Sequence, residues 1–261
     1  MTSNKINKTI KWIGIFAITL IIASCKKDKT NPTTEVPKGT LVLHIHSNID
    51  TSEIEAYDSV YTNNDGRKLS LSLAQIYLSH IKVVKLDGTE IEIENSKILK
   101  TLDAEEIVIG SVPVGNYKTV KFNIGFDATE NQVLPTSNSI LNHSEMWFGS
   151  TFTTNDGYVF AHLSGKIDTS ISMNGNINQM QSFDYKIGKN NHYTSITMPE
   201  QNFSVTANLN QYIHLTIDYG KLLDGIDVTN SSNLNVKTIS DNSTSLANKL
   251  AANLSKIFSY E

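Results

Sequence analysis

The chain has almost no cysteine, and this absence excludes two classes of protein. Its 261 residues include a single cysteine, Cys25. A small secreted domain that depends on disulfide bonds needs cysteines in pairs, so the fold cannot be stabilised in that way. A thiol enzyme is excluded as well if Cys25 carries a lipid. Stability must therefore come from an ordinary hydrophobic core, and a mature chain of roughly 240 residues is long enough to bury one.

The chain also lacks the excess of basic residues that a nucleic-acid-binding surface needs. It has 22 lysines and arginines against 26 aspartates and glutamates. Three of the bases, Lys5, Lys8 and Lys11, precede the first apolar segment, and no acid accompanies them. The remainder has 19 basic and 26 acidic residues, a net charge of −7. Without a basic stripe, we expect no nucleic-acid partner.

The N-terminal apolar run is too short to span a membrane. It covers residues 12–23, about a dozen residues, whereas a membrane-spanning helix needs about 20. Lysines precede the run, and the small residues Ala23 and Ser24 lie directly before Cys25. This order predicts a lipoprotein signal peptide over residues 1–24, with a diacylglycerol added to the thiol of Cys25. The alternative is a short buried helix that happens to precede a cysteine.

Residues 25–39 are polar, contain prolines and lack apolar periodicity. They predict a flexible tether between the lipidated cysteine and the folded domain. The sequence Lys26-Lys27-Asp28 resembles the charged export signals of Bacteroidetes surface lipoproteins. We therefore expect a lipoprotein of the outer membrane, bound to that membrane by its lipid anchor and facing the periplasm or the cell surface.

Residues 40–261 are expected to form one domain that is rich in β-strands. Many short alternating runs, each ended by turn residues, are typical of an antiparallel β-sandwich or barrel. No repeat of 20–50 residues is visible, which argues against a propeller or a solenoid. The predicted strands cover residues 40–46, 69–73, 76–86, 89–93, 106–110, 117–124, 157–163, 183–187, 192–198, 203–207 and 212–219.

The end of the chain has the spacing of a helix rather than of a strand. Leu246, Leu250, Leu254 and Phe258 recur every four residues, which predicts an amphipathic helix of about four turns over residues 243–258. The polar face of this helix is not basic, so we expect it to pack on the sandwich rather than on a membrane. The candidates for its N-cap are Asp241, Asn242 and Ser243.

No known catalytic motif is present. The sequence contains no Gly-x-Ser-x-Gly turn, no phosphate-binding glycine loop and no His-Glu-x-x-His pair. The paired carboxylates of Asp103, Glu105 and Glu106 are explained by a polar turn. The sequence therefore predicts a binding protein and not an enzyme.

His44 and His46 are the residues that most favour a metal site. In a strand, residues i and i+2 point to the same face, about 6.6 Å apart. Imidazole is a good ligand for copper, zinc and nickel, but two ligands are too few for a tight site, so a third donor is required. In the alternative interpretation, Leu41, Leu43 and Ile45 face the core and both histidines merely face water.

Several segments, in one order along the chain, resemble the MbnP-like copper-binding domain family. The resemblance covers most of residues 40–219 and implies a β-sandwich that handles copper without catalysis. The matching segments are residues 71–88, Val112-Pro-Val-Gly-Asn-Tyr117, Phe122-Asn-Ile-Gly-Phe-Asp-Ala-Thr-Glu-Asn131, Met146-Trp147-Phe148, Gly157-Tyr-Val-Phe160 and Gly165.

The resemblance also implies ligands. Methanotroph members of this family hold copper with two histidines and an oxidised tryptophan, and a Trp-x-His pattern on an early strand supplies one of each. Here His46 matches the histidine of that pattern, and His44 stands at the position of the tryptophan. No motif places the second histidine. We take His80 as the candidate because its strand is expected in the same sheet, which gives a copper site of His44, His46 and His80.

Two other functions are compatible with an exported sandwich. A lipoprotein that binds a surface glycan or an envelope protein would expose Trp147, Phe148 and Tyr158 as an aromatic platform, because aromatic faces stack on sugars. A structural module of the envelope would keep the fold, and its histidines would be scattered. Exposure of the three rings and convergence of the histidines distinguish these alternatives from copper binding.

Overall fold

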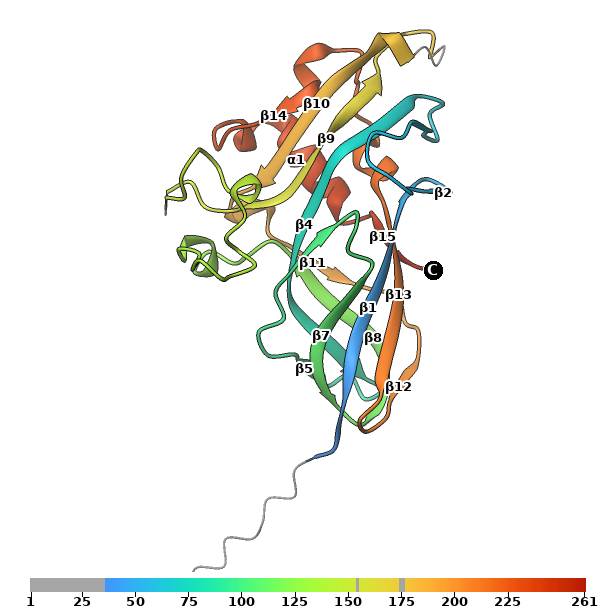
Figure 1. Ribbon diagram of the computed structural model, residues 1–261, viewed down its shortest axis with the longest axis vertical. Coiled ribbons are helices and arrows are strands. Elements are labelled where there is room, and N and C mark those ends of the chain that lie inside the picture. The colour runs from blue at the N-terminus through green and yellow to red at the C-terminus, as the bar shows by residue number, and fades with distance from the viewer. Residues whose placement is uncertain (1–35, 154, 174–176) are drawn as a thin grey trace, which may run out of the picture. The chain divides into compact units, whose positions relative to one another are not determined.

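The strands of the protein form two sheets packed as a sandwich (Figure 1). The computed structural model describes residues 36–153, 155–173 and 177–261. Within these residues the five-stranded sheet contains β1 (Lys38–Ile49), β2 (Ser52–Glu53), β7 (Glu106–Pro113), β13 (Asn210–Asp218) and β15 (Phe258–Tyr260). The ten-stranded sheet contains β3 (Tyr61–Thr62), β4 (Lys68–Lys85), β5 (Glu90–Glu92), β6 (Ile98–Thr101), β8 (Gly115–Ile124), β9 (Val159–Asp168), β10 (Met180–Gly188), β11 (Thr194–Thr197), β12 (Phe203–Val205) and β14 (Asn235–Val236).

The pairing of β1 decides which residues meet on the five-stranded sheet. One edge of β1 runs parallel to β13, in continuous register from the pair Thr40–Asn210 to the pair Asn48–Asp218. The other edge pairs antiparallel with β7 and β2. The predicted sandwich is confirmed, and its pairings are mainly antiparallel; β10 and β14 make a second parallel pair. The parallel pair β1–β13 joins segments about 170 residues apart, which no local pattern reveals.

The long strand β4 lies at the centre of the ten-stranded sheet. Two runs predicted as separate strands, 69–73 and 76–86, are parts of this one strand. Its first half pairs with β9 and its second half with β8; the register shifts once against β9 and twice against β8. The predicted hairpin from 76–86 to 89–93 is confirmed as β4 and β5, with Gly88 at a φ of 89° in the turn.

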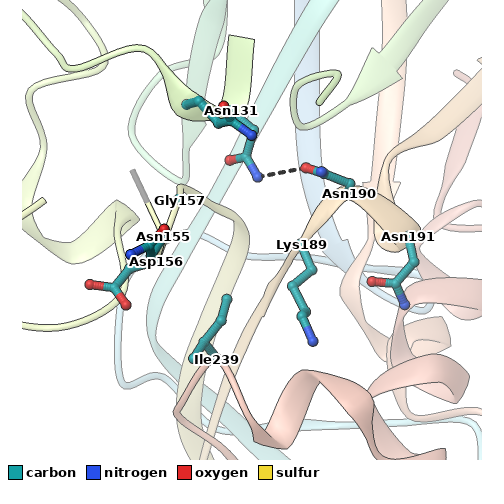
Figure 2. Close-up of a pocket in the computed structure, with 9 residues that line it drawn as sticks. Asn131, Asn155, Asp156, Gly157, Lys189, Asn190, Asn191 and Ile239 are labelled. Carbon is teal, nitrogen blue, oxygen red and sulfur yellow. Dashed lines mark hydrogen bonds between the residues drawn. The ribbon is translucent and has the colours of Figure 1, made fainter. Parts of the chain in front are cut away.

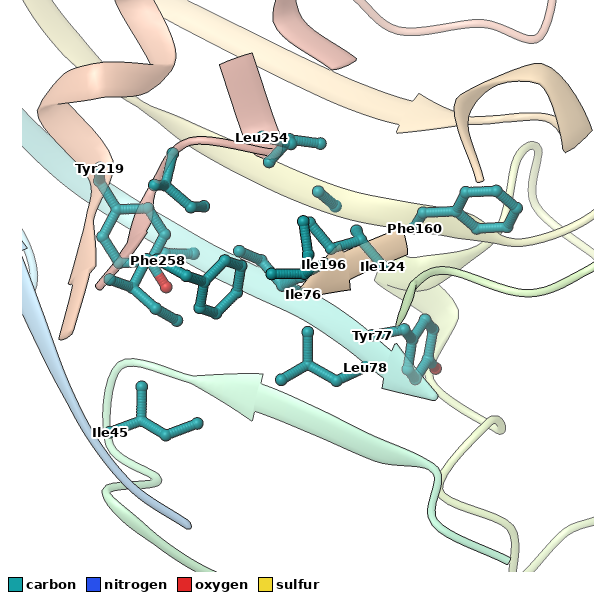
Figure 3. Close-up of a cluster of buried hydrophobic side chains, with 14 of the residues drawn as sticks. Ile45, Ile76, Tyr77, Leu78, Ile124, Phe160, Ile196, Tyr219, Leu254 and Phe258 are labelled. Carbon is teal, nitrogen blue, oxygen red and sulfur yellow. The ribbon is translucent and has the colours of Figure 1, made fainter. Parts of the chain in front are cut away.

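The core lies between the two sheets. On β1 the alternate residues Leu41, Leu43 and Ile45 are fully buried, as the alternation predicts. Side chains of β4 and of the C-terminal segment meet them from the other side (Figure 3). Each large apolar side chain that is buried fully contributes roughly 1.5–3 kcal/mol to folding, so this core stabilises the domain without disulfide bonds.

The C-terminal helix is confirmed but is shorter than predicted. α1 spans Ser245–Leu254 and buries Leu250 and Leu254 against the core. Its N-cap is Thr244, whose side chain accepts a hydrogen bond from the backbone of Ala247, so the three candidate caps were wrong. Residues Asp241–Ser243 form the short 3-10 helix η7 instead. Phe258 belongs to β15, where pairing with β13 and a ring contact with Phe122 outweigh its helical spacing.

Short 3-10 helices occupy several of the connections. Within the described residues they are η1 (Glu130–Gln132), η2 (Ser144–Met146), η3 (Ile177–Gln179), η4 (Asn190–His192), η5 (Tyr219–Leu223), η6 (Ser231–Leu234) and η7 (Asp241–Ser243). None of the helices found in this part of the chain is long and apolar enough to cross a membrane.

The predicted lipoprotein features lie mostly outside the described part of the chain. The signal peptide, Cys25 and the first residues of the tether fall within residues 1–35, which the structure does not describe. The end of the predicted tether, Lys38 and Gly39, belongs to β1. Gly39 packs so closely that a Cβ there would lie 2.4 Å from the backbone oxygen of Thr206. Regular structure therefore begins two residues before the predicted start of the domain.

Candidate metal centre

The two histidines of β1 lie on the outer face of the five-stranded sheet. Leu43 and Ile45 point into the core with no exposed surface, while His44 and His46 are half-buried and point the other way. Their rings meet edge to face, with centroids 4.6 Å apart. The strand alternation therefore places both imidazoles on one surface.

The parallel partner strand adds a third imidazole. His44 is paired in register with His214 of β13, and neighbouring strands lie about 4.8 Å apart. The two rings meet edge to face, and their Nδ1 atoms are 3.0 Å apart. Alternation with Ile213 and Leu215 in the sequence indicates that His214 lies on the polar face of its strand, but only the register of β1 with β13 brings it beside His44.

A carboxylate completes this surface cluster, which we define as His44, His46, His214 and Glu261. Glu261 follows β15, the strand that pairs with β13 next to His214. Its Oε2 lies 3.3 Å from His214 Nδ1 and 3.8 Å from His46 Nε2. His44, His214 and Glu261 each offer one ligand atom, and these three atoms all lie within 4.8 Å of one another. The third donor that the sequence required is therefore present.

The spacing of the cluster suits a transition-metal ion. Two nitrogens that bind one ion at 2.0–2.1 Å in tetrahedral geometry lie roughly 3.3 Å apart, close to the 3.0 Å between the Nδ1 atoms of His44 and His214. Imidazole nitrogen with carboxylate oxygen is a donor set for copper and zinc. His44, His214 and Glu261 could thus hold one ion, and the ring of His46 lies beside them.

Acidic side chains surround the cluster and favour positive charge there. His46 Nδ1 lies 2.6 Å from Glu53 Oε1. This hydrogen bond raises the pKa of His46, while partial burial lowers it; attraction to Glu53, Glu261 and Glu105 adds to the increase. The same carboxylates attract a metal cation, which competes with protons for the imidazoles.

His80 lies elsewhere, which corrects the prediction that it shares a sheet with the early histidines. It projects from β4 in the ten-stranded sheet, whereas His44 and His46 lie in the five-stranded sheet. The structure brings His44 and His46 together and does not bring His80 to them. Strand alternation indicates the face on which a residue lies, but it does not indicate which of two sheets contains the strand.

Two of the other histidines have structural roles. His162 is buried in β9, with Nδ1 3.0 Å from the backbone oxygen of Glu145 and Nε2 3.0 Å from Asp184 Oδ1. His192 is buried too, between the backbone oxygen of Gly188 and the side chain of Asn248. Both rings have a partner at each nitrogen, so they hold loops to the sandwich rather than offer free ligand atoms.

The aromatic platform of the alternative function is not formed. Tyr158 has no exposed surface and donates its hydroxyl to the backbone oxygen of Val133 at 2.7 Å, and Phe148 is 2% exposed. Trp147 is half-buried and packs edge to face on Phe152. Rings that are packed in this way cannot stack on a glycan.

A polar pocket of about 440 Å³ opens near η1 and η4 (Figure 2). Amide side chains dominate its lining, and Asn131 donates a hydrogen bond to Asn190 across it at 2.9 Å. Asn131 also accepts a hydrogen bond from the backbone of Tyr158. No histidine lines this pocket, so it takes no part in the surface cluster.

The chain is similar to proteins of one known family. Among solved structures, MbnP from Methylosinus trichosporium is similar over 74% of this chain and 80% of its own, at 13% sequence identity and a TM-score of 0.47. The curated proteins give no match. The family model MbnP matches residues 38–243, which is well over half of the chain. This chain therefore belongs to the MbnP family.

Proposed function

We propose that this protein binds copper outside the cytoplasm, through the surface cluster of His44, His46, His214 and Glu261, and does not catalyse a reaction on it. The observation that carries the proposal is the in-register pair of His44 and His214, whose Nδ1 atoms are 3.0 Å apart. His46 and Glu261 lie beside this pair. Membership of the MbnP family, which is associated with copper binding, supports copper as the ion.

The chemistry of the cluster also favours copper over other divalent ions. Among first-row metals, Cu²⁺ binds a given nitrogen and oxygen site most tightly. Three imidazoles suit cuprous copper as well, since they are softer ligands than carboxylates. An exposed position on a sheet face fits a protein that takes up and releases an ion, because solvent and partner proteins reach the ligands directly.

A competition titration tests the site assignment. The full chain, solubilised in detergent, is titrated with copper against a chromophoric chelator, once under reducing and once under oxidising conditions. We expect one tightly bound copper in the wild type and a large loss of affinity when His44→Gln and His214→Gln are combined. His143→Gln, which removes a loop histidine outside the cluster, is the control and should bind as the wild type does. Equal affinity in all three proteins would refute the assignment.

We further propose that Cys25 carries the lipid that holds the protein to the outer membrane. The basic flank, the short apolar run and the small residues before Cys25 support this. Mass spectrometry of the protein from its native membrane should show a diacylglyceryl group on Cys25, and Cys25→Ser should release the protein from the membrane fraction. A wild type without this modification would refute the anchor and leave the copper site untouched.

A further inference from the structure

A second cluster of metal-ligating side chains lies in the ten-stranded sheet, apart from the surface cluster. His80 belongs to β4, Asp127 follows β8, and Glu130 begins η1. One ligand atom from each lies within 4.8 Å of the other two. We propose that His80, Asp127 and Glu130 form a second metal site, which takes a divalent cation such as zinc.

The backbone conformation of β4 at His80 directs this side chain towards the carboxylates of Asp127 and Glu130. The pairing of β4 with β8 shifts register between Ser79 and Lys82, which is the position of a β-bulge. His80 sits in this bulge with a φ of 49°, a conformation that histidine adopts more readily than most residues. In a regular strand the side chain would stand roughly perpendicular to the sheet; in this bulge the ring reaches Glu130 of η1, with Nε2 2.8 Å from Oε2.

The two nitrogens of His80 have the partners that a metal-bound histidine commonly has. Nδ1 lies 2.8 Å from Glu92 Oε1, and Nε2 lies 2.8 Å from Glu130 Oε2. In metal sites, one ring nitrogen typically binds the ion while the other donates to a carboxylate that fixes the ring. Glu92 takes the second role, which leaves Nε2 on the side of Glu130 for the ion.

The carboxylate ligands are also held in place before any ion arrives. Asp127 Oδ1 accepts hydrogen bonds from the backbone nitrogens of Thr129 and Glu130, both at 2.8 Å. These hydrogen bonds fix the backbone of the turn that leads into η1, and they thereby orient the side chain of Glu130. Ordering the ligands therefore costs little when the cation binds.

A cavity beside the cluster has room for the ion and its remaining water ligands. Its volume is about 220 Å³, whereas one water occupies about 30 Å³ in the liquid. Three protein ligands are typical of zinc sites that keep a position open to water. The cavity is lined by His80, Glu92, Asn95, Ser96, Lys97 and Glu130.

The charges around this second cluster favour a divalent cation. Its ligands also favour a different metal from the one that the surface cluster favours. Glu92, Asp127 and Glu130 are acidic, and Lys97 Nζ lies 2.7 Å from Glu130 Oε1. Lys82 Nζ lies 3.8 Å from Glu92 Oε2, so with His80 neutral these groups sum to a net charge of −1. One imidazole with carboxylates suits zinc or manganese, and the lack of soft ligands disfavours cuprous copper. Lys97 forms an ion pair with Glu130 and therefore competes with the metal for this carboxylate.

Zinc titration in a background without the surface cluster tests the site. The background is the full chain with His44→Gln, His46→Gln and His214→Gln, so binding there is independent of the proposed copper function. Calorimetry should show one equivalent of zinc, and adding His80→Asn should abolish it, since asparagine tolerates the positive φ but removes the imidazole. Glu200→Gln, at an exposed carboxylate outside the cluster, is the matched control and should leave zinc binding unchanged.

Two further variants separate a metal site from a merely structural ion-pair network. Glu92→Gln should weaken zinc binding about 10–100-fold, the usual effect of losing a carboxylate that orients a ligand histidine. Lys97→Met should strengthen zinc binding, a gain that loss of folding cannot produce. Absence of saturable zinc binding in the background, or binding that persists in His80→Asn, would overturn the proposal. An affinity that Lys97→Met leaves unchanged or weakens would also overturn it.

Discussion

Lys100 is a buried cation whose removal should make the protein more stable. It lies in β6 with no exposed surface. Its ammonium group donates hydrogen bonds to Ser47 Oγ at 3.1 Å and to the backbone oxygen of Thr101 at 2.6 Å. Burial lowers the pKa of Lys100 from 10.5 to about 8, although attraction to Glu105 and Asp103 opposes this change. The charged form is therefore destabilised by the fold.

The size of the effect follows from that pKa. A fall from 10.5 to about 8, at roughly 1.4 kcal/mol per pH unit, corresponds to a penalty of about 3 kcal/mol at neutral pH. Lys100→Met removes this penalty, but it leaves Ser47 and Thr101 without a donor, which costs about 1 kcal/mol for each. We expect the variant to be more stable than the wild type by about 1–2 kcal/mol at pH 7.

The sign of the pH dependence distinguishes this explanation from a simple packing effect. Below pH 8 the lysine is charged in both the folded and the unfolded protein, and the penalty is fully present. Between pH 8 and pH 10.5 the folded protein releases the proton first, so the wild type gains stability relative to Lys100→Met. Urea unfolding of both proteins at pH 7 and pH 10 measures the difference. A less stable variant at pH 7, or a stability difference that is the same at both pH values, would show that the buried charge of Lys100 does not destabilise the fold.

Three further predictions concern the sandwich itself. Burial raises the pKa of Asp184, but the hydrogen bond with His162, together with attraction to His162, Lys237 and Lys186, outweighs burial, so the net pKa is lowered from 3.8; Asp184→Asn should therefore lose stability at pH 7, and the loss, measured by urea unfolding, should shrink as the pH falls below 3.8. Gly165→Ala should destabilise the β4–β9 pair by about 3 kcal/mol, because its Cβ would lie 1.9 Å from the backbone oxygen of Ser70; an unchanged melting temperature would contradict this. Leu254→Ala should cost about 2–5 kcal/mol in thermal unfolding, since the side chain is buried where α1 meets the core, and a cost below 1 kcal/mol would show that the helix packs loosely.

The local patterns of the sequence predicted the elements well because alternation and helical spacing are read from neighbouring residues. Alternation on β1 placed His44 and His46 on one face, as the structure has them. The helical spacing found α1 but extended it to Phe258, since the pairing of β15 with β13 is a tertiary contact that spacing does not contain. Bounds and caps were therefore less accurate than the elements themselves.

The site could be predicted only in part because its ligands come from distant segments. His214 joins His44 through a parallel register across 170 residues, and a parallel pair leaves no hairpin signal in the sequence. Glu261 enters through β15, which the helical spacing concealed. His80 was assigned to the wrong sheet, and the bulge that turns its ring is visible only in the pairing of β4 with β8.

X-ray absorption spectroscopy of the copper-loaded full chain tests whether the surface cluster holds the ion. We expect a first shell of nitrogen and oxygen with outer-shell scattering from two or three imidazole rings, because the rings of His44, His46 and His214 lie together on the sheet face. Combining His44→Gln, His46→Gln and His214→Gln should remove that imidazole signal. Copper with an oxygen-only shell in the wild type, or an imidazole signal that is undiminished in the triple variant, would contradict the assignment.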